Sequence, residues 1–115
     1  MNELKSNEHL IYETDHCQLI QDDHSETFYV QLKGDAIAFK FCQLIALKRK
    51  LQAVDIIKLL ASDSPDVELI HMPHCDRFFV FTVQEILELK ALLEGGFTML
   101  ELNSMIHKTL VRPLA

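Results

Sequence analysis

Glycine is scarce in this chain, which has only 3 glycines in 115 residues. Neither of the glycine-rich loops that cradle phosphate groups, GxGxxG and GxxxxGK followed by Ser or Thr, occurs in the sequence. The GxSxG motif of serine hydrolases is absent as well. These absences exclude the common nucleotide-binding and hydrolase classes that carry a short glycine motif.

Cysteines and long apolar runs are also few. The 3 cysteines are an odd number, which is untypical of a disulfide framework. No apolar run approaches the roughly 20 residues that a membrane helix needs, and residues 1–9 hold no apolar segment of a secretory signal. We therefore expect a cytoplasmic protein with reduced thiols and no membrane partner.

Positive charge is in short supply, with 11 Lys and Arg against 17 Asp and Glu and a net charge of −6. The tight basic cluster, Lys48-Arg49-Lys50, would fan around most of a helical turn instead of forming a stripe. An acidic chain without a basic stripe repels phosphate backbones, so we expect no nucleic-acid partner.

The composition itself is that of a globular protein, with 49% hydrophobic and 24% charged residues. We expect a single domain over residues 1–115, large enough to hold a core without disulfides or a structural metal. Residues 1–8 are polar and are expected to fray. Six β-prone segments are predicted as strands: 10–12, 17–21, 27–32, 36–39, 67–71 and 77–81.

Helical periodicity begins at Phe41, and Asp55 is placed to begin a second short helix. The apolar stripe steps by three and four residues through Leu44, Leu47, Leu51, Val54, Ile57 and Ala61. A third helix is predicted to begin at Thr82, with Glu85 completing a capping box, and to end at Gly95-Gly96. Residues 62–66 are the predicted linker between the two halves, and a last helix is predicted from Thr98.

These elements predict an α+β fold, with an antiparallel sheet of about five or six strands and helices on one face. Residues 39–51 resemble residues 81–93 at an offset of 42 residues, where four pairs are identical: Phe39/Phe81, Leu47/Leu89, Lys48/Lys90 and Leu51/Leu93. We interpret this as an internal duplication of a strand–strand–helix–helix unit over about 27–61 and 67–109. The alternative is that two amphipathic helices after strands share their periodicity.

The dipeptide His-Cys occurs twice, at His16-Cys17 and at His74-Cys75, each in a predicted turn. Such turns lie at the same end of an antiparallel meander, where two imidazoles and two thiolates form a tetrahedral ligand set that suits zinc. Neither half has the spacing of a typical zinc motif, so ordinary turn residues are the alternative.

The sequence disfavours two other functions. A Cys–His nucleophile would need Cys75 to find a partner such as His71 or His16, since neighbouring strand side chains point to opposite faces. A DNA-binding pair of helices over 84–93 and 98–108 conflicts with the acidic charge. We therefore expect no enzyme.

The segment Phe78-Phe79-Val80-Phe81 is continuously apolar, whereas a strand with one wet face alternates. Both faces of this strand should therefore be covered, one by the domain and the other by a partner subunit, with Phe78 or Phe79 at the interface. The leading hypothesis is a small domain of uncharacterised role that acts by protein association, as a homodimer or adaptor.

Overall fold

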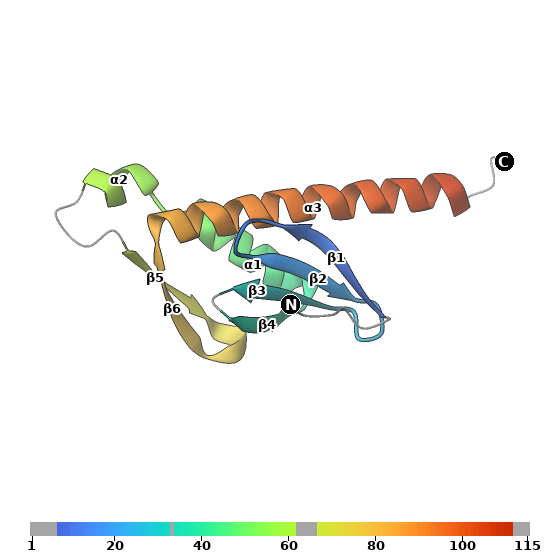
Figure 1. The fold of residues 1–115 in the computed structure, drawn as a ribbon, viewed down its shortest axis with the longest axis horizontal. Coiled ribbons are helices and arrows are strands. Elements are labelled where there is room, and N and C mark those ends of the chain that lie inside the picture. Colours follow the sequence, from blue (N-terminus) through green and yellow to red (C-terminus); the bar gives the residue numbers. More distant parts are fainter. Residues whose placement is uncertain (1–6, 33, 62–66, 112–115) are drawn as a thin grey trace.

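The computed structural model describes residues 7–32, 34–61 and 67–111 (Figure 1). These residues form six strands, one α-helix of 12 residues, one α-helix of 29 residues and two short helical segments. Their order is β1 (Glu8–Glu13), β2 (Gln18–Asp22), β3 (Thr27–Leu32), β4 (Asp35–Phe39), α1 (Phe41–Gln52), α2 (Ile56–Ala61), β5 (Val67–Met72), the 3₁₀ turn η1 (Pro73–Cys75), β6 (Arg77–Thr82) and α3 (Val83–Val111). All six predicted strands are confirmed within two residues at each end.

The strands divide into two antiparallel sheets. β1, β2, β3 and β4 form a meander in chain order, and β5 pairs with β6 in a separate hairpin. The hairpin lies beyond β4 and leads directly into α3 (Figure 1). The α+β class with helices packed on the sheet is therefore confirmed, and the six strands are shared between a four-stranded and a two-stranded sheet.

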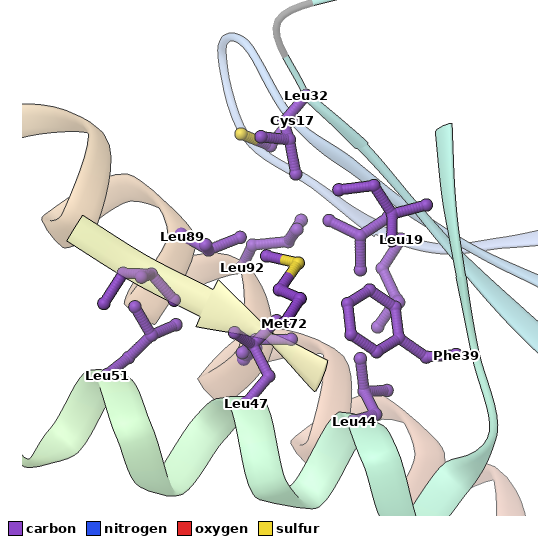
Figure 2. Packing of buried hydrophobic residues seen from close by; sticks show 14 of the residues in the cluster. Cys17, Leu19, Leu32, Phe39, Leu44, Leu47, Leu51, Met72, Leu89 and Leu92 are labelled. Carbon is purple, nitrogen blue, oxygen red and sulfur yellow. The ribbon is translucent and has the colours of Figure 1, made fainter. Parts of the chain in front are cut away.

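One hydrophobic core joins both sheets to α1 and α3. Figure 2 shows Met72 of β5 between Leu47 of α1, Leu92 of α3 and Phe39 of β4. The six helical positions predicted to be buried are all buried: Leu44, Leu47, Leu51, Ile86, Leu89 and Leu93. The 3.6-residue period therefore identified the inward stripes of α1 and α3 correctly. The predicted continuation of the first stripe through Ile57 is wrong, because α1 ends at Gln52 and Ile57 lies on the separate helix α2, where it is 80% exposed.

The two halves begin their helices in the same way. Phe39 at the end of β4 and Phe81 one residue before the end of β6 are both buried in the core. The next residue in each case, Lys40 or Thr82, donates its backbone N–H to a side chain three positions on. The acceptors are Gln43 Oε1 at 2.8 Å and Glu85 Oε1 at 2.9 Å. The halves then differ, because α1 ends at Gln52 whereas α3 continues to Val111. Duplication stays a prediction.

The predicted end of a helix at Gly95-Gly96 is wrong, because α3 runs through both residues as one helix. A Cβ at Gly95 would clash with the ring of Tyr12, and a Cβ at Gly96 would clash with Cδ2 of Leu19. The two glycines therefore let α3 lie close against β1 and β2, and they serve packing rather than capping. The separate helix predicted from Thr98 is the second half of α3, which extends past the sheet (Figure 1).

Other predictions concern segment ends. Asp55 Oδ1 accepts the backbone N–H of Lys58 at 3.0 Å, so the predicted start of the short second helix is confirmed. Asn7 donates to Asp22 Oδ1 at 2.6 Å, and Glu8 begins β1. The remainder of the segment expected to fray, and the predicted linker 62–66, lie outside the described residues. None of the described helices, α3 included, has the length and apolar character needed to span a membrane.

Candidate functional site

The first His-Cys pair lies in the turn between β1 and β2, where a carboxylate of α3 holds it. Glu88 Oε2 accepts hydrogen bonds from Thr14 Oγ1 and from the backbone N–H of His16, both at 2.7 Å. Oε1 of the same carboxylate lies 2.9 Å from Nδ1 of His16. The hydrogen bond from Thr14, followed by that from His16, lowers the pKa of Glu88 to about 2.

Cys17 is buried beside this carboxylate. Burial, and next the negative charge of Glu88, raises the pKa of the Cys17 thiol to about 11. A protonated thiol is a poor nucleophile, and a carboxylate with so low a pKa is a poor general base at neutral pH. A cavity of about 470 Å³ adjoins His16, Cys17 and Glu88. The hydrogen bonds of Glu88 nevertheless form a structural latch, by which we mean the contact that fixes the β1–β2 turn to α3.

The second His-Cys pair lies in η1 and has different neighbours. Nε2 of His74 donates to the backbone carbonyl of Ala38 at 2.8 Å, and its ring lies 4.5 Å from that of Phe39. Cys75 Sγ lies 3.6 Å from the backbone oxygen of Met72. The contacts of His74 attach the turn of the hairpin to β4, whereas that of Cys75 lies within the hairpin.

The two pairs are thus held by different elements, Glu88 of α3 in one case and β4 in the other. Across residues 7–32, 34–61 and 67–111, no three His, Cys, Asp or Glu side chains are grouped as a metal site requires. The zinc site of His16, Cys17, His74 and Cys75 stays a prediction, and the described geometry adds no support for it.

The predicted interface strand, β6, has Phe78 and Phe79 on opposite faces. Phe79 is buried with Phe81 against the core, whereas 61% of Phe78 is exposed. Three neighbours on the outer face are exposed too: Val67 at 39%, Leu69 at 57% and Val80 at 53%. Leu69 is directly opposite Val80 in the register of the hairpin. We call Val67, Leu69, Phe78 and Val80 the outer face of the hairpin.

The ring of His71 extends this face, stacked on Phe78 with a centroid distance of 4.2 Å and an interplanar angle of 17°. Its Nε2 is buried and has no hydrogen-bond partner among the described residues, and Oδ1 of Asp76 lies 3.7 Å away. A buried polar atom without a hydrogen bond is costly, and the nearby carboxylate of Asp76 offsets part of that cost.

A groove of about 620 Å³ runs beside β5. One wall is β5, from Glu68 to His71, and the other is the end of α1 with the start of α2. The helical wall comprises Lys50, Ala53, Val54, Asp55 and Lys58. Lys50 Nζ donates to the backbone carbonyl of His71 across this groove.

Sequence reasoning named Phe78 but missed its companions on β5. The signal was present, because Val67 and Leu69 alternate with positions that point inward, and a hairpin brings such alternating residues opposite those of β6. The role of Glu88 carried no local signal, since its partners are 72 and 74 residues away in sequence.

No protein-family model, curated protein or solved structure matches this chain.

Proposed function

We propose that the protein acts by association and forms a homodimer through the outer face of the β5–β6 hairpin. The observation that carries the proposal is the exposure of Val67, Leu69, Phe78 and Val80 on one face of two paired strands. Contiguous apolar patches of this kind are typical of interaction sites on small soluble domains.

The area of the patch suits a dimer. If a large side chain has about 150–200 Å² of surface, the exposed fractions leave on the order of 350 Å² of apolar surface per copy. Two copies would therefore bury about 700 Å². A standard interface of about 1,600 Å² is a little over half apolar, which is about 900 Å², so the patch supplies most of what a stable dimer needs.

The charge of the patch favours a second copy as the partner. A two-fold contact places the same surface against itself, so a charged face would repel its equivalent. The whole chain carries a net charge of −6, but the four side chains of the outer face carry none. Residence in the cytoplasm belongs to the same proposal and is supported by three cysteines that are all unpaired.

The test is the mass of the protein in solution, measured by sedimentation equilibrium. Phe78 exposes about 120 Å², and its burial contributes about 3 kcal/mol per copy at 25 cal/mol per Å². Phe78→Glu should therefore give a monomer with an unchanged far-ultraviolet circular dichroism spectrum. Phe79→Glu should unfold the domain, because it places a charge in the core.

Leu87→Glu is the matched control, since it makes the same kind of change at an exposed apolar position of α3, outside the hairpin. This variant should remain a dimer. A wild-type protein that sediments as a monomer at tens of micromolar would overturn the proposal. So would a Phe78→Glu variant that stays dimeric.

A further inference from the structure

We infer that His71 makes the dimer of the outer face dependent on pH: two copies associate while the imidazole is neutral and separate when it gains a proton. The inference rests on the proposed function, since it concerns the regulation of the same surface. The position of His71 within that surface carries it.

His71 lies among the apolar side chains that the proposed dimer covers. It is directly opposite Phe78 in the register of the hairpin, and its ring is stacked on that of Phe78 at a centroid distance of 4.2 Å. Val67, Leu69 and His71 occupy every second position of β5, so they point to the same side of the strand. The side chain of His71 is 38% exposed, and a second copy packed on Phe78 would cover it.

The imidazole adds a titratable group to a surface whose four apolar side chains carry no charge. Histidine is the side chain whose charge ordinarily changes between pH 5 and pH 8. Covering an imidazolium with apolar side chains removes water from a charge, which favours the neutral ring. A two-fold contact also places the same surface of both copies together, so protonation adds two like charges to one interface. Each proton therefore opposes association.

The two groups of the same copy that favour the charged ring are present before association. Oδ1 of Asp76 lies 3.7 Å from Nε2 of His71, but the Asp76 side chain is 95% exposed, so water weakens the attraction. The face of the Phe78 ring attracts a cation stacked on it. Both contacts are made in the free copy and in the dimer, so they do not by themselves make association depend on pH.

The other charged groups near His71 come from α1, α2, β5 and η1. The groove beside β5 is lined by two lysines and two carboxylates, whose formal charges cancel: Lys50, Lys58, Asp55 and Glu68. Lys50 Nζ binds the backbone carbonyl of His71 and not its ring. The second imidazole of the hairpin, that of His74, donates to the backbone carbonyl of Ala38 in the same copy. The outer face therefore meets its partner with His71 as the group that titrates.

The test is the dissociation constant of the wild-type dimer, measured by sedimentation equilibrium at pH 7.5 and at pH 5.5. Both copies carry the imidazole, so the effects of two protonations multiply, and the constant should be at least tenfold higher at pH 5.5. The far-ultraviolet circular dichroism spectrum should be the same at both pH values, because the copies separate without unfolding.

His71→Gln and His71→Arg form a matched pair, since one removes the titratable group and the other makes the charge permanent. The dissociation constant of His71→Gln should change less than about twofold between the two pH values. The planar guanidinium of His71→Arg still stacks on Phe78 and pairs with Asp76, so this variant should be a folded monomer at pH 7.5. His24→Gln removes an exposed imidazole from the turn between β2 and β3, and it should keep the pH dependence of the wild type.

A dimer of equal strength at both pH values would overturn the inference and leave the proposed dimer intact. So would a tighter dimer at pH 5.5, which would mean that Asp76 and Phe78 hold the charged ring better once it is covered. A His71→Gln variant that keeps the pH dependence, or a His71→Arg variant that is dimeric at pH 7.5, would overturn it as well. A wild-type protein that is monomeric at both pH values would overturn the dimer and this inference together, so the two failures are distinguishable.

Discussion

Replacement of Glu88 by glutamine isolates the electrostatic part of the contact between the β1–β2 turn and α3. The carboxylate accepts hydrogen bonds from Thr14 and from the backbone of His16, and its side chain is 17% exposed. Glutamine keeps the shape and one acceptor oxygen but carries no charge. The variant should fold and lose stability.

The magnitude follows from the low pKa of Glu88. A pKa lowered from 4.5 to about 2 corresponds to about 3 kcal/mol of stabilisation when the carboxylate is ionised. Water at the rim of the contact screens part of this, so we expect Glu88→Gln to lose about 2 kcal/mol at pH 6. Glu101→Gln, which removes an exposed charge from the same helix, should change the stability by less than about 0.5 kcal/mol.

The dependence on pH distinguishes charge from packing. Stabilisation by ionised Glu88 is complete above pH 4.5 and is lost as the pH falls through about 2, because the unfolded chain takes up the proton first. The hydrogen bond to Glu88 also raises the pKa of His16, and that contribution is lost as the pH rises through the raised pKa. The difference between wild type and Glu88→Gln should therefore be greatest between about pH 4.5 and 6.5.

Urea denaturation followed by circular dichroism at pH 6 and at pH 3 measures this difference. At pH 3 it should have fallen to less than half of its value at pH 6. A loss of equal size at both pH values would refute the electrostatic reasoning, and would mean that glutamine acts by disturbing the packing of the turn.

Two further predictions concern α3 and the thiols. Gly96→Ala should lower the free energy of unfolding by about 1 kcal/mol, because the clash with buried Leu19 costs about 1–3 kcal/mol and improved helix propensity contributes about 1 kcal/mol in return. Ala91→Gly, at an exposed position of the same helix, measures the helix propensity alone. A Gly96→Ala variant more stable than wild type would contradict the packing role of this glycine. At pH 8, iodoacetamide should alkylate exposed Cys42 much faster than Cys17, whose pKa is about 11. Peptide mass mapping measures the two rates, and equal rates would contradict the burial of Cys17 beside Glu88.

Of the outer face of the hairpin, the part that could be predicted from the sequence was strand β6. The run from Phe78 to Phe81 indicated two apolar faces, and strand alternation required Phe78 and Phe79 to point apart, as they do. The groove along β5 was not predictable, because its helical wall comes from α1 and α2, and the position of one element beside another is set by the packing of the whole core.

Sequence by itself determined the elements whose pattern is local: six strands from their β-prone segments, and the inward stripes of α1 and α3 from their period. Tertiary structure alone decided the role of Gly95-Gly96, since a glycine pair ends a helix in isolation but continues it where Tyr12 and Leu19 leave no room for a Cβ. It also decided that Cys17 meets Glu88, a carboxylate 71 residues away that stabilises a turn. Local periodicity states which way a side chain faces, and only the assembled chain determines what it meets there.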